Sequence, residues 1–161
     1  MESEDYRPQQ IISGGQTGVD RGALNAAILL DIPHGGTCPR GRRAEDGAIP
    51  GRYLLTESKS PEYTVRTRIN VEDGDATLVV IGGKGAGRGT RLTLKVAESK
   101  GRPVLMVETR GRDEPDETDE ERVRKWLAEH RPKVLNVAGT RGSEAPEGER
   151  FTRDLLVRVC S

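Results

Sequence analysis

Residues 10–30, QIISGGQTGVDRGALNAAILL, decide the fold of this chain. The short apolar segment 11–13 breaks into a glycine-rich turn at 14–18, and apolar residues at helical spacing follow directly. Residues 17–20, TGVD, have the form of a capping box, which predicts that the helix begins at the glycines. A strand that enters a helix through such a turn gathers backbone N–H groups and the positive end of the helix dipole at one point. The stretch therefore predicts an α/β fold with an anion site after its first strand, although a tight turn without a ligand is the simpler alternative.

The rest of the chain continues this alternation of strand and helix. Short or unbroken apolar runs predict further strands at 32–36, 53–56, 76–81, 103–107 and 134–138. Amphipathic helices are predicted between them and at the end of the chain, where Thr152, Leu155, Leu156 and Val159 share one face. A second capping box is predicted at 118–121. We therefore expect a three-layer α/β/α Rossmann-like fold with a mostly parallel central sheet.

The composition indicates one folded domain without a net charge. At 161 residues the chain fits a single domain, and we expect a flexible lead-in over 1–9 and one Rossmann-like domain over 10–161. Lys plus Arg and Asp plus Glu both count 26, so no net charge attracts nucleic acid or an acidic membrane. No apolar run approaches the roughly 20 residues that cross a bilayer. Neither nucleic acid nor a membrane is therefore an expected partner.

The cysteines and histidines predict neither a disulfide framework nor a metal site. Cys38 and Cys160 form no C-x-x-C pair, and with only His34 and His130 there is no zinc-type cluster. Catalysis by Cys38 is disfavoured, because it has no base unless His34 folds back onto it. No hydrophobic signal region opens the chain. These features predict a protein of the reducing cytoplasm, and no residue is assigned to a metal site.

Three of the predicted strands end in glycine-rich turns, after Ser13, Ile81 and Ala138. In parallel sheets ligands bind beyond the carboxyl ends of the strands, so these turns are expected to meet in one pocket. Their amides, hydroxyls and arginines suit a phosphate, a phosphorylated small molecule or a tetrahedral oxyanion. The candidate ligand-binding residues are Gly14, Gly15, Gln16, Thr17, Gly18, Arg21, Arg43, Gly83, Gly87, Arg88, Gly89, Thr90, Gly139 and Ser143. The charged loop 37–52, which holds Arg43, equally fits a solvated loop.

The sequence offers few candidates for catalysis. Residues 82–90 do not form a P-loop, and no dinucleotide fingerprint follows the first strand, so we expect neither a flavin nor an NAD cofactor. Asp20 and Glu45 lie in the candidate loops and are conceivable acids or bases. No nucleophilic triad stands out, and no catalytic residue is assigned. A binding protein is therefore favoured over an enzyme.

Three motifs carry a resemblance to a known family. GGQTGVDRGAL at 14–24, CPRGRRAEDGAIP at 38–50 and NVAGTRGSEAP at 136–146 resemble the molybdenum carrier family, which is similar to the molybdenum-cofactor carrier proteins of algae and bacteria. That family belongs to a Rossmann-like group that includes the LOG, or lysine-decarboxylase-like, enzymes. The resemblance implies binding of the molybdenum cofactor, a phosphorylated pterin, or of molybdate, without transformation. It also implies a homo-oligomer, either a dimer or a tetramer.

The LOG enzymes define the main alternative. They hydrolyse nucleoside monophosphates and carry a P-G-G-x-G-T-x-x-E motif with a catalytic glutamate. The matching stretch 86–93, AGRGTRLT, keeps part of the glycine cradle but has Thr93 in place of the glutamate. Threonine cannot act as that base at neutral pH. Two alternatives stay open: a phosphoribohydrolase that uses Asp20 or Glu45, and a sensor that binds a nucleotide derivative without turnover.

Overall fold

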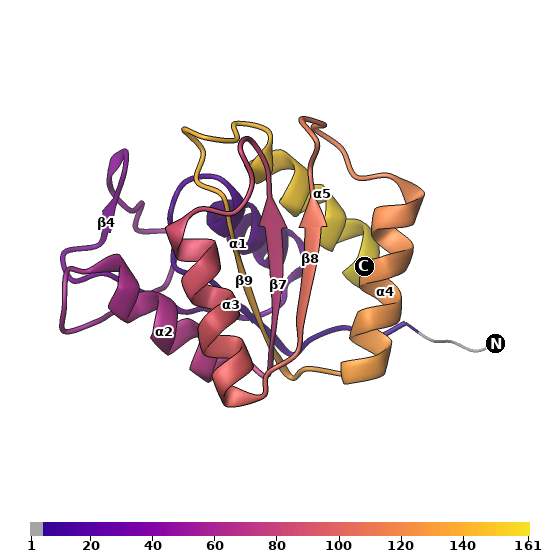
Figure 1. The fold of residues 1–161 in the computed structure, drawn as a ribbon, viewed down its shortest axis with the longest axis horizontal. Coiled ribbons are helices and arrows are strands. Elements are labelled where there is room, and N and C mark those ends of the chain that lie inside the picture. The colour runs from indigo at the N-terminus through magenta and orange to yellow at the C-terminus, as the bar shows by residue number, and fades with distance from the viewer. Residues whose placement is uncertain (1–4) are drawn as a thin grey trace.

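A computed structural model describes residues 5–161 and contains one five-stranded sheet (Figure 1). Its order is β2-β1-β9-β7-β8, and every neighbouring pair is parallel. The strands are β1 (Gln10–Ile12), β2 (His34–Gly35), β7 (Ala76–Ile81), β8 (Val104–Glu108) and β9 (Val134–Gly139). The last strand of the chain therefore lies in the middle of the sheet, beside the first.

Helices cover both faces of this sheet. One face carries α1 (Val19–Leu30), α4 (Glu117–His130) and α5 (Gly148–Cys160), and the other carries α2 (Tyr63–Asp73) and α3 (Arg88–Lys100). In Figure 1, α2 and α3 lie in front of the sheet and α1 and α5 lie behind it. The predicted three-layer Rossmann-like fold is confirmed.

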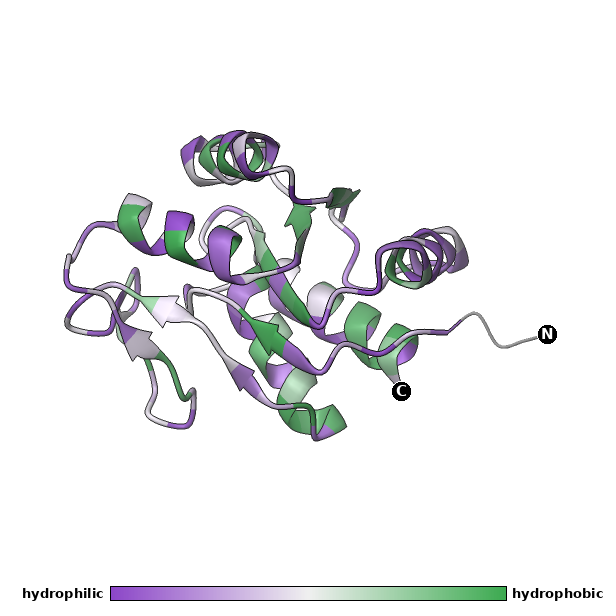
Figure 2. Ribbon diagram, turned by 90° about the horizontal axis from the view of Figure 1, so that it is seen from below, coloured by the Kyte–Doolittle hydropathy of each residue, from purple (hydrophilic) through white to green (hydrophobic). Residues whose placement is uncertain are grey.

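The two faces of the sheet are packed differently. The main core lies under α1, α4 and α5 and includes Leu78, Leu135 and Phe151, none of which is exposed. Under α2 and α3 the apolar cluster is small, and polar side chains such as Asn70 and Asn136 are buried there. Figure 2 shows the apolar residues gathered on the central strands and the inward sides of the helices. The α2/α3 face is therefore the polar side of the sheet.

The apolar run at 103–107 predicts a buried strand, but β8 is mostly half-buried. Val107 is its one buried residue, whereas all six residues of β7 are buried. The reason is topological, because β8 is an edge strand and β7 lies between two neighbours. An unbroken apolar run does not distinguish these two positions.

The charged segment after β2 is ordered by short pairings. β3 (Thr37–Cys38) pairs in parallel with β6 (Thr56–Glu57), slightly later than the strand predicted at 53–56. β4 (Arg43–Ala44) and β5 (Gly47–Ala48) form an antiparallel hairpin. Arg42 donates hydrogen bonds to three backbone carbonyls of the segment, those of Ile49, Pro50 and Tyr53. The segment is therefore a folded unit with its own small apolar cluster around Tyr53.

Helix ends depart from the sequence prediction in two places. The first capping box is not formed, because Gly18 caps α1 without a side-chain hydrogen bond and Thr17 bonds elsewhere. The second box forms two residues earlier than predicted, between Asp116 and Asp119. At α1 the Thr17 hydroxyl donates to the Glu45 carboxylate instead. At α4 the Asp116 and Asp119 carboxylates each accept from the backbone N–H of the other residue.

The N-terminal lead-in is bound to the segment between α4 and β9. The Tyr6 hydroxyl donates to the Pro132 carbonyl at 3.0 Å, and the Gln9 N–H donates to the Lys133 carbonyl at 2.9 Å. Residues 1–4 of the expected lead-in lie outside the described residues. Within 5–161, none of the helices combines the length and the apolar character needed to cross a membrane.

Close approach of α1 and α5 depends on Gly22. A Cβ atom there would lie 2.3 Å from the Glu149 carbonyl oxygen, and backbone cannot move aside as a side chain can. We expect Gly22→Ala to lower the free energy of unfolding by about 2 kcal/mol through overpacking, measured by chemical denaturation. The matched control is Gly89→Ala in α3, where a Cβ meets open space and stability should stay the same or rise slightly. Equal stability of the two variants would contradict this packing.

Candidate functional site

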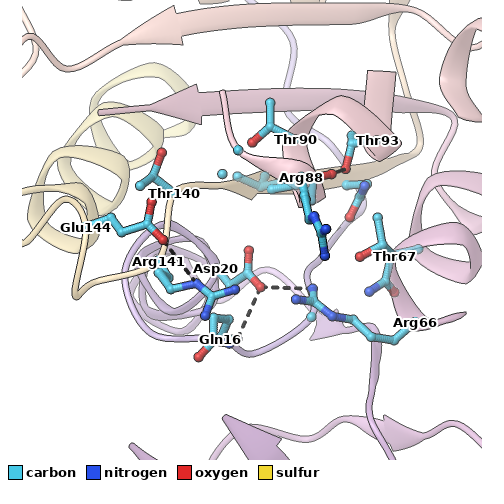
Figure 3. A pocket seen from close by; sticks show the side chains of 18 of the residues that line it. Gln16, Asp20, Arg66, Thr67, Arg88, Thr90, Thr93, Thr140, Arg141 and Glu144 are labelled. Atoms are coloured by element: carbon cyan, nitrogen blue, oxygen red, sulfur yellow. Dashed lines mark hydrogen bonds and ion pairs between the residues drawn. The ribbon is translucent and has the colours of Figure 1, made fainter. Parts of the chain in front are cut away.

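The three predicted glycine-rich turns meet at one cavity of about 320 Å³ (Figure 3). It lies on the α2/α3 face of the sheet, at the carboxyl ends of β1 and β9 and beside the N-terminus of α3. Its lining residues come from the three loops, β9, α1, α2 and α3: Gly14, Gln16, Asp20, Arg66, Thr67, Asn70, Gly85, Gly87, Arg88, Gly89, Thr90, Thr93, Asn136, Val137, Ala138, Gly139, Thr140, Arg141 and Glu144. A cavity at this edge of a parallel sheet is where such folds bind ligands.

The structure divides the sequence-derived candidates into two groups. The cavity is lined by Gly14, Gln16, Gly87, Arg88, Gly89, Thr90 and Gly139, together with the conceivable acid Asp20. The cavity is not lined by Gly15, Thr17, Gly18, Arg21, Arg43, Gly83, Ser143 or Glu45. Gly15, Gly18 and Gly83 have positive φ angles of 80°, 85° and 61°, so they shape the turns around the cavity. Arg43 is exposed on the β4–β5 hairpin.

Arg21 is held by the β4–β5 hairpin and not by the cavity. Its Nη1 and Nη2 atoms donate to the two carboxylate oxygens of Asp46 at 2.7 and 2.8 Å, and its Nε donates to the Gly15 carbonyl. The bidentate hydrogen bonds from Arg21 hold the pKa of Asp46 below its ordinary value. The charge of Arg21 is thus matched within the protein.

Glu45, next to Asp46 at the tip of the hairpin, joins the two loops behind the cavity. Its carboxylate accepts hydrogen bonds from the Ser143 N–H at 3.0 Å, the Ser143 hydroxyl at 2.6 Å and the Thr17 hydroxyl. Desolvation opposes the charge of Glu45, but the hydrogen bonds from Ser143 and Thr17 outweigh it and keep its pKa below the ordinary value. Thr17 and Ser143 therefore bind a carboxylate of the chain itself.

Removing the Glu45 carboxylate should loosen these loops. We expect Glu45→Ala to lower the free energy of unfolding by about 1 kcal/mol at neutral pH, because the carboxylate accepts hydrogen bonds from three donors and the variant loses all three. Since the pKa is depressed, this contribution is present above the unfolded-state pKa and disappears as pH falls through the folded-state value. Hydrogen exchange of residues 40–48 and 140–145 should rise together. Glu98→Ala, an exposed carboxylate on α3, is the control, and unchanged exchange in the Glu45 variant would contradict the assignment.

Sequence reasoning missed the contribution of α2. Arg66, Thr67 and Asn70 line the cavity from this helix, although none lies in a glycine turn. Thr67 and Asn70 are buried on the same side as Val71. Polar residues on the buried face of a helix were the available signal, but without knowledge of which face is buried they resemble ordinary surface residues.

Arg66 and Asp20 form a buried ion pair in the cavity wall. Nη1 of Arg66 lies 3.3 Å from Oδ2 of Asp20, and the side chains are only 14% and 4% exposed. The Gln16 N–H donates to the same carboxylate oxygen at 3.1 Å. Burial raises the pKa of Asp20, and the charge of Arg66 offsets only part of that rise. Gly14 makes room for Arg66, because a Cβ atom there would lie 1.8 Å from Nη1.

Three buried polar atoms of the lining have no hydrogen-bond partner within the described chain: Gln16 Nε2, Arg66 Nε and Asn136 Oδ1. The orientation of the Gln16 amide is fixed, because its Oε1 accepts from the N–H groups of Thr17 and Glu45. The Asn136 amide nitrogen donates to Thr77 at 3.2 Å, which leaves its oxygen as the free acceptor. Unsatisfied buried polar atoms are costly, so these walls suit a ligand that offers both acceptors and donors.

Positive charge dominates the open side of the cavity. Arg88 and Arg141 line it with Arg66, against the carboxylates of Asp20 and Glu144. Figure 3 shows Arg66 and Arg88 extending toward the same part of the cavity from α2 and α3. The α3 N-terminus adds to this charge, because Gly87 offers no side-chain cap and the first turn has no acidic residue.

The position of the LOG glutamate is occupied by a hydroxyl with an internal partner. Thr93 lines the cavity, and its hydroxyl donates to the Gly89 carbonyl at 2.9 Å. Cys38, for which catalysis was disfavoured from the sequence, packs with Leu24 and Tyr53 and does not line the cavity. Burial raises the pKa of its thiol. His34 accepts a hydrogen bond from the Leu54 N–H. Among residues 5–161 there is no group of three or more His, Cys, Asp or Glu side chains that could hold a metal ion.

Comparisons with known proteins place this geometry in a family. The model of the circularly permutated YpsA SLOG family, cpYpsA, matches residues 11–160. A crystal structure from Syntrophus aciditrophicus, described as a putative molybdenum carrier protein, superposes with a TM-score of 0.87 and 39% sequence identity over 96% of each chain. No curated protein matches the sequence. Both findings agree with the resemblance drawn from the three motifs.

Proposed function

Since the chain belongs to the circularly permuted YpsA SLOG family, we propose that it binds a phosphorylated small molecule or an oxyanion in this cavity. The ligand that we infer is the molybdenum cofactor, a pterin phosphate, or molybdate itself. Similarity to the described molybdenum carrier supports a carrier role. In this role the protein holds its cargo without transforming it.

The observation that carries the proposal is the pairing of an uncapped helix N-terminus with three arginines around one cavity. The amides at the start of α3 and the guanidinium groups of Arg66, Arg88 and Arg141 favour an anion. Arg88 has no ion-pair partner within residues 5–161. A phosphate or oxyanion between these groups would supply the negative charge that the lining lacks.

The inner wall fits the heterocyclic part of such a ligand. Gln16 Nε2 and Asn136 Oδ1 offer one free donor and one free acceptor, which can pair with a carbonyl oxygen and an N–H group of a pterin ring. The lining contains neither cysteine nor histidine. The protein would therefore hold the cofactor by its phosphate and its ring edge, and not by side-chain ligands of those two types to molybdenum.

Purification from cells with an intact cofactor pathway tests the proposal. The protein should carry pterin fluorescence and molybdenum, and mass spectrometry should identify a phosphorylated compound released on denaturation. The variant Arg88→Ala should lose most of that cargo, while Arg68→Ala, an exposed arginine on α2, should keep it. Protein that is free of any ligand and ignores added cofactor and molybdate in thermal-shift titrations would refute the proposal.

A second candidate is a phosphoribohydrolase of the LOG type, and one observation favours it. Asp20 is a buried carboxylate in the cavity wall with a raised pKa, as a general acid at neutral pH requires. Glu45 is not available for this role, because it binds Thr17 and Ser143 outside the cavity. Release of free base from a panel of nucleoside monophosphates, abolished in Asp20→Asn, would establish the enzyme. A ligand that binds without turnover and is a nucleotide derivative would instead identify a sensor.

The proposal includes a homo-oligomer, either a dimer or a tetramer, in the cytoplasm. The large apolar side chains exposed on the described surface are Ile28, Leu29 and Leu54. Ile28 and Leu29 lie in the last turn of α1, and the Leu54 carbonyl lies close to Gly35 of β2, so this edge of the sheet is the candidate contact between subunits. Light scattering of the wild type and Leu29→Glu would measure the assembly.

Both cysteines are free and buried, as suits a reducing compartment.

A further inference from the structure

We propose that Arg66 leaves its ion pair with Asp20 when an anion binds and pairs with the anion instead. Asp20 then takes up a proton from solvent. This inference rests on the proposed function, since it requires an anion in the cavity. It adds that binding is coupled to protonation of the protein, so that the affinity for the anion falls as pH rises. In this account Asp20 is a positioning residue, which holds Arg66 ready for the ligand.

The hold of Asp20 on Arg66 is weak for a buried pair. The two side chains share one contact of 3.3 Å, whereas Arg21 and Asp46 share two hydrogen bonds of 2.7 and 2.8 Å. The Nε atom of Arg66 is buried without a partner. An oxyanion that accepts from both Nε and an Nη atom would make the bidentate geometry that Asp20 does not make. Arg66 therefore gains hydrogen bonds when it turns to the ligand.

Asp20 has little else to keep it ionised. The charged groups that act on it are Arg66 from α2 and, more weakly, Arg21 from its own helix. Its carboxylate accepts two hydrogen bonds, one from Arg66 Nη1 at 3.3 Å and one from the Gln16 N–H at 3.1 Å. From the other elements around the cavity come Arg88 on α3 and the Arg141–Glu144 pair after β9. Burial already raises the pKa of Asp20 above the ordinary value. A dianion beside it that also takes over Arg66 raises that pKa further.

The direction of the coupling follows from these two pKa changes. When the pKa of a group is higher in the complex than in the free protein, binding takes up protons between the two values. In that window the affinity falls by up to about tenfold per pH unit as pH rises. The proton comes from solvent and is held on a carboxylate oxygen of Asp20.

Inorganic sulfate is the appropriate probe, because it keeps the same charge from mildly acidic to mildly alkaline pH. Any change of sulfate affinity with pH therefore comes from the protein. Calorimetry in two buffers of different ionisation enthalpy should show uptake approaching one proton per sulfate bound. Asp20→Asn should bind sulfate with an affinity that is nearly independent of pH and with no proton uptake. Asp113→Asn, an exposed carboxylate before α4, should behave like the wild type.

The outcomes separate this inference from the proposed function. Sulfate binding by the wild type that is independent of pH, without proton uptake, would overturn the exchange and leave the anion site intact. Failure of sulfate, phosphate and molybdate to bind at any pH would overturn both. Should Asp20→Asn not fold, the two-buffer experiment on the wild type and on Arg66→Gln decides, since the exchange requires uptake to disappear when Arg66 is removed.

Discussion

Replacing Arg66 by alanine is expected to destabilise the protein by about 3 kcal/mol at neutral pH, since it leaves Asp20 as an unpaired buried charge. The same substitution should weaken binding of the proposed anion about 100-fold, which is the loss expected for a charge-assisted contact in a partly buried site. Both effects come from one side chain, because Arg66 is at once the partner of Asp20 and part of the cavity wall. No other substitution proposed for this protein affects stability and binding so strongly together.

The stability loss should depend on pH in a defined direction. The pKa of Asp20 is raised in the folded wild type, so its ionisation lowers stability as pH rises from the unfolded-state pKa through the folded-state value. Without Arg66 the folded-state pKa rises further and the loss extends to higher pH. Wild type and Arg66→Ala should therefore converge as pH falls below the folded-state pKa of Asp20 in the wild type, because Asp20 is then protonated in both.

Denaturant titrations of Arg66→Ala and Arg68→Ala across pH make the comparison. Arg68 lies on the same helix and is exposed, so its removal should change neither stability nor binding measurably. A constant difference between wild type and Arg66→Ala at every pH would show that Arg66 contributes by packing alone. That result would contradict the ion pair as the source of its effect.

Gly14→Ala is expected to reduce anion binding at least tenfold while the protein stays folded. The new Cβ atom would occupy the place of the Arg66 guanidinium, which can move because it is the end of a flexible side chain. Gly14 does not have a positive φ angle, so its backbone accepts alanine without strain. Arg66 is retained but displaced, and the variant therefore tests its position and not its charge.

Gly51→Ala is the matched control for Gly14→Ala, because a Cβ atom there meets open space on the segment after β5. Calorimetric affinity for molybdate or phosphate, with far-UV circular dichroism to verify folding, is the measurement. Unchanged affinity in a folded Gly14→Ala protein would mean that the Arg66 guanidinium does not contact the anion where we place it.

Much of the fold was predictable because the apolar periodicity and the turn residues of this chain indicate the same element boundaries. β7 was predicted with its observed bounds, since a nearly unbroken apolar run of six residues lies between Asp75 and a glycine pair. The inward face of α5 was also predicted, and Thr152, Leu155, Leu156 and Val159 are all buried. The order of the strands was not predictable, because the placement of β9 beside β1 depends on contacts distant in sequence.

The cavity was predictable only where glycine turns form it. The turns of Gly15, Gly87 and Gly139 were expected to share one hollow. Gly87 and Gly139 line the same cavity, and in the first turn Gly14 lines it in place of its neighbour Gly15. Arg66 was not expected, because helix α2 reaches the cavity through tertiary packing that no local pattern encodes. Arg21 was assigned to ligand binding and Glu45 was considered as an acid or base because both lie in the candidate loops, yet each has a partner within the protein.

Titration with inorganic phosphate, followed by amide chemical shifts, is the decisive test of an anion site between the glycine turns. We expect the largest and saturable changes at Gly14, at Gly87 and the first turn of α3, and at Gly139, with smaller changes at Arg66. Changes confined to exposed arginines elsewhere, such as Arg110 after β8, or no saturable change at all, would contradict an anion site between these turns.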